Sequence, residues 1–433
     1  MSGGGRKRPV CMLTHSYYEE DPRLRREARA LVERGRPVDV YALRRAGDPA
    51  HDACDGVSVH RMNVQRHQGA GLGTYLREYV SFFVRAGLAA TLAHPRRRYA
   101  VVQVHTLPDF LVFAAAPLRL SGVPVVIDLH EAMPEFFRSR FPGASGSLVY
   151  SLLEMQERLS IAAADRAITV NDALATRLRA RGVSPDKITV VPNYPVLGLF
   201  DDAAHNTRMF MADGTLQLIY AGALTPMYEL DVALGAVAEV RRRRPEIQPR
   251  LAIYGRGDSE EQLRTQADRL GIADSVAFHG RIPIEDVPAA IAAADVGLAP
   301  TRRDRYTNDS LSTKIFEYAA MRKAIVASQL PLVDRIFGPA SVTTYEPGNA
   351  ASMADAILRL VDEPEERDRR VEEARKIVRQ ASWEIEADRY SALIEELAPD
   401  GSTTLATAGR TAAYSPAELG DGVAAAPASR EDA

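Results

Sequence analysis

Cysteine is nearly absent from this chain of 433 residues, which holds Cys11 and Cys54 and no others. Two cysteines without metal-ligand spacing exclude a disulfide framework, and they fit a reducing compartment. Long apolar segments are also lacking: no stretch approaches the roughly 18 residues that span a bilayer. The apolar run near the N-terminus is too short for a signal peptide. We therefore expect a cytoplasmic protein.

An excess of charge of one sign is lacking as well, since 54 Lys and Arg stand against 57 Asp and Glu. A balanced chain has no overall electrostatic footprint for nucleic acid, so we expect no nucleic-acid partner. Several binding motifs are missing. There is no G-x-x-x-x-G-K-[ST] loop and no Asp-x-Asp pair, and GRGDSE at 255–260 lacks the third glycine of a dinucleotide motif. We expect a site that uses no metal ion and no cofactor.

What the chain does contain is a regular alternation of short apolar runs with amphipathic helical segments. Candidate strands in the first half are 9–15, 37–43, 57–62, 100–105, 124–130, 166–170 and 188–192. Those in the second half are 216–222, 250–255, 276–280, 295–300 and 324–328. Apolar strands separated by helices predict parallel sheets covered on both faces. The sequence thus predicts two doubly wound α/β domains.

The breaks in this alternation predict the domain boundaries. We expect a first domain at 1–195, a linker at 196–214, a second domain at 215–382, a last amphipathic helix at 383–398 and a tail at 399–433. The tail is rich in Ala, Gly, Ser, Thr and Pro and has no apolar period, so we expect it to be disordered.

Histidines follow strands of the first domain at equivalent positions. His15, His105 and His130 each end a candidate strand, and Asp128 lies near the end of the third. Ligands of open parallel sheets bind beyond the carboxyl ends of the strands. One histidine at such a place is more often structural, but three on one rim make them candidate site residues.

Glycines take the same positions in the second domain. Gly222, Gly255 and Gly280 each end a candidate strand. Glycine at a strand end lets a ligand approach the backbone closely. Two such rims facing each other would suit an enzyme with two substrates.

Lysine is rare, with five among the 54 basic residues, and Lys314 lies at a helix start in SLSTKIFEYAAMRKAIVAS, 310–328. Ser312 or Thr313 is a competent N-cap for this helix. The unpaired N–H groups of its first turn and the Lys314 ammonium together predict an anion site. Glu317 lies on the same helix face and could accept two hydroxyl protons from a ribose. The alternative is a surface ion pair between Lys314 and Glu317.

With these residues in view, the chain resembles the GT-B glycosyltransferases, specifically the large retaining family 4, from about Pro9 to Leu397. The most specific segments are LIYAGALTP, LAIYGRGD, VAFHGRIP, AADVGLAP and SLSTKIFEYAAMRKAIVAS, in that order. DPRLRREARALVERG resembles the family's opening helix, and HEAMPE after VVIDL resembles its acceptor-side loop. The resemblance implies two Rossmann-like domains facing across a cleft and a last helix that crosses back to the first domain.

The resemblance also implies site residues. Glu317 matches the family's ribose-binding glutamate, Lys314 a basic residue near the diphosphate, and His130 a histidine that faces the transferred sugar; these are the catalytic candidates. The further nucleotide-sugar-binding candidates are Gly222, Gly255, Arg256, Gly257, Gly280, Arg281, Asp309, Ser312 and Thr313. Asp309 replaces the family's usual glutamate eight residues before Glu317.

Two family cations are replaced, since their positions fall on Ala223 and Tyr228. Arg256, Arg281 or one of three arginines in the loop 301–309 could supply the charge; the three are Arg302, Arg303 and Arg305. The family's glycine-rich loop after the first strand is replaced by SYYEEDPRLRRE.

The implied reaction is metal-independent transfer of a sugar from a nucleotide-sugar donor to an acceptor hydroxyl, with retention of anomeric configuration. The acceptor could be a saccharide, a lipid-linked sugar or a small molecule. The alternatives are an epimerase or a phosphorylase of the same architecture, or a catalytically inactive subunit that binds a sugar nucleotide. Ala223 and Tyr228 favour the inactive subunit.

Residues 76–99, LREYVSFFVRAGLAATLAHPRRRY, predict an apolar helix with a basic end. We expect it mainly to pack inside the first domain. The alternative is peripheral contact with an anionic bilayer at the cytoplasmic membrane, which would suit a lipid-linked acceptor.

Overall fold

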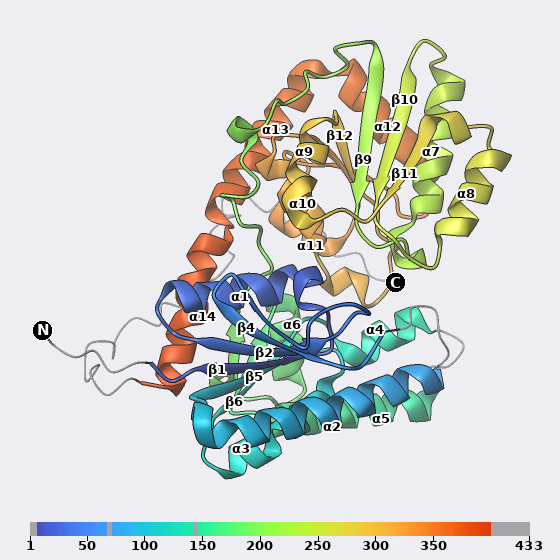
Figure 1. The fold of residues 1–433 in the computed structure, drawn as a ribbon. Helices are drawn as coiled ribbons and strands as arrows, with labels where there is room; N and C mark the ends of the chain where they lie inside the picture. Colours follow the sequence, from blue (N-terminus) through green and yellow to red (C-terminus); the bar gives the residue numbers. More distant parts are fainter. Residues whose placement is uncertain (1–6, 67–71, 142–145, 400–433) are drawn as a thin grey trace, which may run out of the picture.

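The computed structural model describes residues 7–66, 72–141 and 146–399. Two α/β domains lie one above the other, each built on its own sheet (Figure 1). All but the first residue of the predicted disordered tail lies outside the described residues.

The N-terminal domain holds an eight-stranded sheet in the order β3-β4-β2-β1-β5-β6-β7-β8. Its strands are β1 (Val10–Thr14), β2 (Val38–Leu43), β3 (His51–Cys54), β4 (Val57–Met62), β5 (Val101–His105), β6 (Val125–Leu129), β7 (Arg166–Thr169) and β8 (Ile188–Val190). All pair in parallel except β3, which is antiparallel to β4. The seven predicted strands are confirmed. The edge strand β3 was not predicted because most of its residues are exposed and carry no apolar pattern.

Helices cover both faces of this sheet. They are α1 (Pro22–Glu33), α2 (Leu72–Arg97), α3 (Ala116–Leu120), α4 (Met133–Arg140), α5 (Ser147–Ala163) and α6 (Asp172–Ala180), with 3₁₀ helices η1 (Tyr18–Glu20), η2 (Asp109–Ala115) and η4 (Pro185–Lys187). A further 3₁₀ helix, η5 (Asp202–Ala204), lies in the connecting segment, and its Asp202 pairs with Arg375 of the C-terminal domain at 3.3 Å. Asp21 caps α1 by accepting from the Leu24 N–H at 3.1 Å, and Pro22 takes the first helical position. No helix in the described ranges is both long and apolar enough to cross a bilayer.

The C-terminal domain holds a six-stranded parallel sheet in the order β11-β10-β9-β12-β13-β14. Its strands are β9 (Thr215–Ala221), β10 (Gln248–Tyr254), β11 (Val276–Gly280), β12 (Val296–Ala299), β13 (Ala324–Ser328) and β14 (Thr343–Tyr345). Its helices are α7 (Leu230–Arg243), α8 (Glu260–Arg269), α9 (Val287–Ala292), α10 (Thr313–Ala320), α11 (Pro331–Ile336), α12 (Ala350–Asp362) and α13 (Pro364–Gln380), with 3₁₀ helices η6 (Pro226–Tyr228), η7 (Ala273–Ser275), η8 (Ile284–Asp286) and η9 (Thr307–Asp309). The five predicted strands are confirmed, and the three-residue β14 was not predicted.

The strand order determines where each domain can bind a ligand. It reverses between β1 and β5 in the first sheet and between β9 and β12 in the second. Ligands of open α/β sheets bind at such switch points, beyond the carboxyl ends of the strands. His105 ends β5, and Gly222 follows β9.

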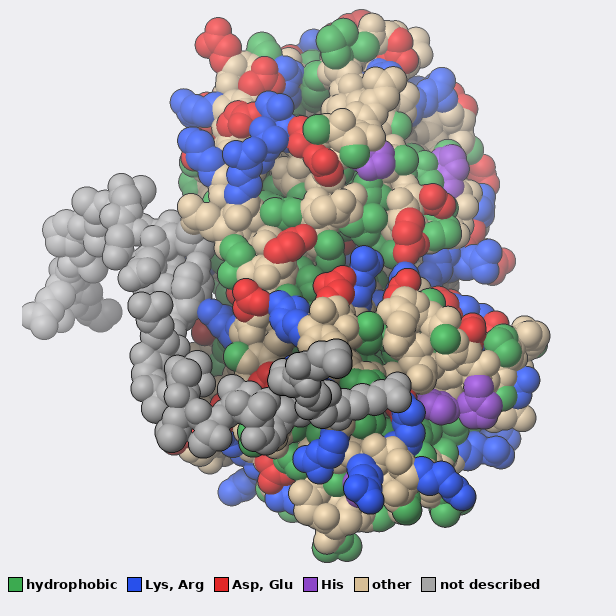
Figure 2. Space-filling model, turned by 60° about the vertical axis from the view of Figure 1, so that its left-hand side comes forward, with side chains coloured by type: hydrophobic (Ala, Val, Ile, Leu, Met, Phe, Trp, Pro, Cys, Tyr) green, Lys and Arg blue, Asp and Glu red, His purple; other side chains and the backbone are tan. Residues whose placement is uncertain are grey.

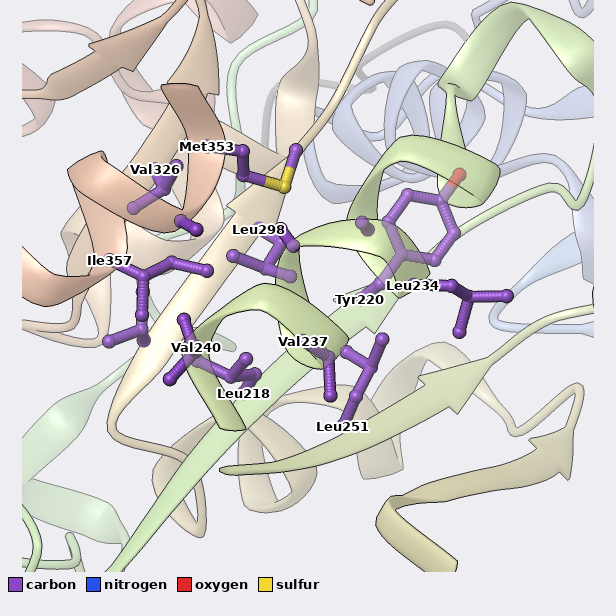
Figure 3. Packing of buried hydrophobic residues seen from close by; sticks show 14 of the residues in the cluster. Leu218, Tyr220, Leu234, Val237, Val240, Leu251, Leu298, Val326, Met353 and Ile357 are labelled. Carbon is purple, nitrogen blue, oxygen red and sulfur yellow. The ribbon is translucent and has the colours of Figure 1, made fainter. Parts of the chain in front are cut away.

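The core of the C-terminal domain supports this edge of its sheet. Figure 3 shows strand residues meeting α7 and α12; those labelled are Leu218, Tyr220, Leu251, Leu298, Val326, Leu234, Val237, Val240, Met353 and Ile357. Tyr220 lies at the margin of this cluster, with its hydroxyl directed away from the aliphatic side chains. That hydroxyl donates to the Ala223 carbonyl at 2.7 Å, so the core anchors the loop after β9.

The last helix, α14 (Trp383–Leu397), leaves the C-terminal domain and packs beside α1 of the N-terminal domain (Figure 1). Tyr390 is fully buried there and donates a hydrogen bond of 2.6 Å to Gln103 of β5. Arg36 pairs with Glu395 at 2.7 Å. The crossing helix expected from the resemblance is therefore present.

Candidate active site

Side chains of the two domains contact each other around the facing ends of their sheets. Arg25 of α1 pairs with Glu285 at 3.0 Å, and Ser139 of α4 donates to Asp304 at 2.7 Å. The Phe136 and Tyr306 rings meet edge to face, with centroids 5.6 Å apart. Both rims of the predicted site therefore lie at the domain boundary.

Three of the predicted glycines form a closely packed cradle after β9 and β10. A Cβ placed on Gly255 would lie 1.8 Å from the Gly222 carbonyl oxygen, and one on Gly257 would lie 2.2 Å from the Leu224 carbonyl oxygen. A Cβ on Gly222 would lie 2.3 Å from Lys314 Cε. At Gly255 and Gly257 the close atoms are backbone carbonyls, so glycine is required there, whereas at Gly222 a side chain would displace the end of Lys314. The same contacts bring Lys314 against the cradle.

Lys314 is a buried cation in an unusual environment. Its Nζ lies 4.2 Å from the ring centroid of Tyr228 and 5.1 Å from that of Tyr220. Among the residues that the structure describes, no carboxylate or other acceptor bonds to this Nζ. Burial lowers the pKa of Lys314 to about 8, against a smaller raising effect of Glu317. Tyr228, which replaces a family cation, thus provides the ring face on which the remaining cation lies.

The N-terminus of α10 offers further donors beside Lys314. Ser312 is the N-cap, as predicted, and the helix begins at Thr313. The Ser312 hydroxyl makes no capping bond, and it is buried without a partner in the described structure. The first N–H groups of a helix have no intrahelical acceptor, so this end can bind an anion.

Glu317 and Lys314 form no ion pair in the described structure and Lys314 is buried, so the alternative of a surface ion pair between them is wrong. Burial raises the pKa of Glu317, and the charges of Lys314 and Arg26 lower it. Arg26 comes from α1 of the other domain, where its guanidinium lies 5.0 Å from the Trp383 ring and donates to the Tyr194 carbonyl at 3.0 Å. Sequence reasoning missed Arg26, because no local pattern connects α1 with α10.

Two of the three predicted histidines meet. His130 Nε2 lies 3.2 Å from Asp128 Oδ2 and 3.3 Å from His105 Nδ1. Arg23 donates to both Asp128 oxygens, at 2.9 and 2.8 Å. Burial alone would raise the pKa of Asp128, but Arg23 and the two histidines hold that pKa well below its usual value.

The third histidine, His15, lies elsewhere. Its ring packs edge to face on Tyr79 and Phe82, with centroids 4.6 and 5.4 Å apart, and burial lowers its pKa to about 3. His15 is therefore a neutral packing residue, separate from the His105–His130 pair.

The ligand atoms of His105, Asp128 and His130 lie within 4.8 Å of one another, which is close enough to surround a metal ion. The Asp128 carboxylate is already engaged, because both of its oxygens accept from Arg23. A second cation beside this buried guanidinium would also be repelled. We therefore describe the trio as a hydrogen-bonded support for His130.

The remaining candidates lie around the same boundary. Gly280 accepts the Gly255 N–H at 2.7 Å. The Arg281 side chain reaches across to Glu20 of the N-terminal domain, and the Asp309 carbonyl accepts from Asn171 of α6 at 3.0 Å.

The arginines that could replace the two missing cations differ in whether the protein already binds their side chains. Arg302 donates to the Ser139 carbonyl, and Arg303 donates to that of Gln329. Arg256 and Arg305 are exposed. Arg256 lies between two glycines of the cradle, which makes it the best placed of these arginines to add charge there.

Glu131, next to His130, is a further residue that sequence reasoning did not single out. Burial raises its pKa, and it accepts a hydrogen bond from Tyr306 of the other domain. Its Oε2 atom is buried without a partner in the described structure. The quoted motif HEAMPE contains Glu131, but only the meeting of the two domains shows where it lies.

Comparison with known proteins agrees with this arrangement. Residues 21–194 match the glycosyl transferase 4-like domain, and residues 209–377 match the glycosyl transferases group 1 family. A D-inositol 3-phosphate glycosyltransferase of a Nocardioides strain is 26% identical over 380 residues, which cover 82% of this chain and 80% of the relative.

Solved structures show the same fold. Sucrose-phosphate synthase from Thermosynechococcus elongatus has a TM-score of 0.70 at 17% identity, covering 90% of this chain and 99% of its own. HepE of Anabaena, solved in complex with UDP and glucose, has a TM-score of 0.65 at 15% identity, covering 90% of this chain and 100% of its own. The chain therefore belongs to the group 1 (family 4) glycosyltransferases of the GT-B fold.

Proposed function

We propose that this glycosyltransferase takes its sugar from a nucleoside diphosphate sugar bound between the glycine cradle and the N-terminus of α10. The observation that carries the proposal is Lys314, a buried ammonium without an acceptor, packed over Gly222 beside the unpartnered Ser312 hydroxyl. Burying a cation without a partner is costly. A diphosphate would supply both the acceptor oxygens and the opposite charge.

In this scheme the cradle and helix end stabilise the leaving diphosphate. Negative charge grows on the β-phosphate as the glycosyl bond breaks, and fixed donors aimed at that charge lower the barrier. Lys314 and the first N–H groups of α10 take this role, and Arg256, between two glycines of the cradle, adds a further positive charge. No metal ion is needed for it.

Glu317 positions the nucleotide. Its carboxylate lies one helical turn after Lys314, and it makes no ion pair with that residue. It can therefore accept the two hydroxyl protons of a ribose. The charges of Lys314 and, across the domain boundary, Arg26 oppose the rise in the pKa of Glu317 that burial causes.

His130 faces the transferred sugar from the N-terminal domain. Asp128 and His105 orient its ring. These two side chains are fully buried, whereas the His130 imidazole is partly exposed. We propose front-face attack by the acceptor hydroxyl, with the departing phosphate taking its proton and the anomeric configuration retained. Positioning, rather than a dedicated carboxylate base, then supplies the catalysis.

The acceptor remains one of three classes: a saccharide, a lipid-linked sugar or a small molecule. The proposal places the enzyme in the cytoplasm, with peripheral contact at the cytoplasmic membrane. The match to the glycosyltransferase family and the anion site at the N-terminus of α10 favour transferase activity over epimerase activity. The inactive-subunit alternative is opposed by Lys314, the cation that remains beside the positions at which Ala223 and Tyr228 replace two others.

A thermal-shift panel tests the donor site. The wild-type protein is titrated with UDP-, GDP-, ADP- and TDP-sugars, and one of them should raise the melting temperature because a ligand that binds only the folded state stabilises it. Lys314→Met should reduce that shift at the same donor concentration. Equal shifts in the two proteins would contradict the proposed site.

The second arm tests transfer. Product formation with the selected donor should require an added acceptor. Conversion of the donor to an isomer without acceptor would indicate an epimerase, and binding without any product across acceptor classes would indicate an inactive subunit.

A further inference from the structure

The outward face of α2 is apolar along its length. Large side chains recur at every fourth position and are 46–64% exposed: Leu76, Val80, Val84, Leu88 and Leu92. The opposite side of the same helix is buried in the domain, through residues such as Phe82, Ala86 and Ala90. A surface helix normally turns its polar residues outward. The expectation that residues 76–99 mainly pack inside the domain holds for only one side of the helix.

A second helix repeats this pattern beside it. On α5 the exposed large apolar residues are Leu148, Val149, Leu152, Met155 and Leu159, between 37% and 73% exposed. Both helices pack on η2, and residues of all three elements belong to one core cluster. They therefore lie on the same side of the sheet, as Figure 1 shows along the lower edge of the molecule.

Two more apolar side chains, Phe113 of η2 and Leu120 of α3, are exposed on the elements that these helices flank, and Leu120 is 90% exposed. We call the exposed apolar residues of α2, α5, η2 and α3 the α2–α5 face. Contiguous apolar patches of more than a few hundred Å² are uncommon on soluble monomers and mark interaction sites.

The charges on this face are of one sign. The exposed charged residues of the two helices are all arginines, and one of them, Arg97, is paired with Asp39: Arg77, Arg85, Arg96, Arg97 and Arg158. Of the acidic residues, Glu78 and Glu157 are buried, and the partly exposed Glu154 is paired with Arg181 at 2.7 Å. Figure 2 shows basic and apolar side chains along the lower end of the molecule, with few acidic ones.

We propose that the α2–α5 face binds the surface of an anionic lipid bilayer, with both helices lying in the plane of the interface. Aliphatic side chains flanked by arginines are the composition of interfacial helices, in which the apolar residues enter the acyl boundary and the arginines contact anionic headgroups. A second copy of the chain fits less well. A two-fold contact would bring the arginines of one face against those of the other.

The face also reaches the acceptor side of the site. Helix α4 begins three residues after His130 and packs against α5. A membrane-bound acceptor held at this face would therefore approach the first domain's half of the site. This inference extends the proposed function, from which it takes only the peripheral location, and it can be tested without any donor.

Vesicle flotation tests it with a matched pair of variants. Leu88→Gln combined with Leu152→Gln removes one anchor from each helix. Leu270→Gln combined with Ile385→Gln removes exposed apolar residues elsewhere, on α8's end and on α14. Vesicles of phosphatidylcholine alone are compared with vesicles containing about 30% phosphatidylglycerol, each at roughly 0.1 and 0.5 M salt.

Wild type and the control should float with anionic vesicles, and the α2–α5 variant should bind on the order of ten- to a hundred-fold more weakly, because a buried leucine is worth roughly ten-fold in partitioning. Arg77→Gln with Arg85→Gln should cost about five-fold per arginine, or ~1 kcal/mol each, and should flatten the salt dependence. Binding by wild type should fall at the higher salt.

Three results would overturn the inference. They are wild type that does not float with anionic vesicles, an α2–α5 variant that floats like wild type, and a concentration-dependent dimer in sedimentation equilibrium that this variant abolishes. Each variant is also melted with and without the donor selected above. An unchanged donor shift alongside lost flotation separates failure of the membrane face from failure of the donor site.

Discussion

Replacing Lys314 by methionine should lower activity while leaving the ligand-free protein at least as stable. Methionine matches the length of the lysine stem and removes the charge. Arginine would be a poor substitute, because Lys314 Cε already lies 2.3 Å from the position of a Cβ on Gly222 and its end is packed between the Tyr220 and Tyr228 rings. The two substitutions therefore test charge and space separately.

The expected loss of activity follows from the bond that the ammonium makes to the diphosphate. A hydrogen bond to a charged group is worth about 1.5–3 kcal/mol, so kcat/KM should fall roughly 10- to 150-fold. Steady-state kinetics with the donor varied at saturating acceptor measure it. If the lysine acts on the departing phosphate, kcat falls together with kcat/KM.

The expected stability has the opposite sign. Burial lowers the pKa of Lys314 from 10.5 to about 8, which at pH 7 corresponds to about 3 kcal/mol of destabilisation by the charged form. Contact with the two rings offsets roughly 0.5–2 kcal/mol of this. Lys314→Met should therefore raise or preserve the melting temperature of the free protein, as measured by calorimetry. A lysine with a purely structural role would give a lower melting temperature on its removal.

The pH dependence of donor binding has a defined sign. The diphosphate favours the charged ammonium and so raises the lysine pKa in the complex. Its contribution to affinity is complete below the free-enzyme pKa of about 8 and is lost as the pH rises through the higher pKa of the complex. Isothermal titration should show wild-type affinity falling above pH 8 and a flat profile for Lys314→Met. Turnover of that variant within about two-fold of wild type, or a parallel pH profile, would refute the reasoning.

Three further substitutions have defined outcomes. Gly255→Ala would place a methyl group 1.8 Å from a carbonyl oxygen, so it should lower the melting temperature and abolish the donor shift, whereas Gly73→Ala, which meets open space, should change neither. Glu317→Gln should reduce kcat/KM about ten- to a hundred-fold through weaker ribose binding, seen mainly in the donor KM. Asp128→Asn removes two charge-assisted hydrogen bonds from Arg23, which keeps Glu27 at 3.2 Å, and should cost about 1.5–3 kcal/mol in urea unfolding at pH 7. Because the folded pKa of Asp128 is depressed, that difference should shrink as the pH falls below about 4, and a pH-independent difference would contradict it.

Local sequence patterns predicted most of the fold. Apolar β-branched runs predicted twelve strands that the structure contains, because a parallel strand buried on both faces must be apolar throughout. The start of α10 was predicted for an equally local reason, since Ser312 is a residue type that favours the N-cap position, although its hydroxyl makes no capping bond here. The strand β3 was not predicted, because exposed residues at a sheet edge do not need to be apolar.

The candidate site residues also fall into those that local sequence patterns predicted and those that only the tertiary structure placed. The sequence alone predicted Lys314, Glu317 and the strand-end glycines, since each follows from a helix start or a strand end within a few residues. Only the tertiary structure placed Lys314 on the Tyr228 ring, brought Arg26 of the other domain towards Glu317, and separated His15 from His130.

The α2–α5 face shows the limit most directly. Residues 76–99 were recognised as apolar, but whether those side chains are buried depends on which elements cover them. The periodicity of a sequence shows that a helix has apolar sides. It does not show whether other elements of the chain cover each of those sides or whether one side contacts something outside the chain. The pairing of α2 with α5 is a long-range contact, and long-range contacts are determined by how whole layers pack, which no short window of sequence contains.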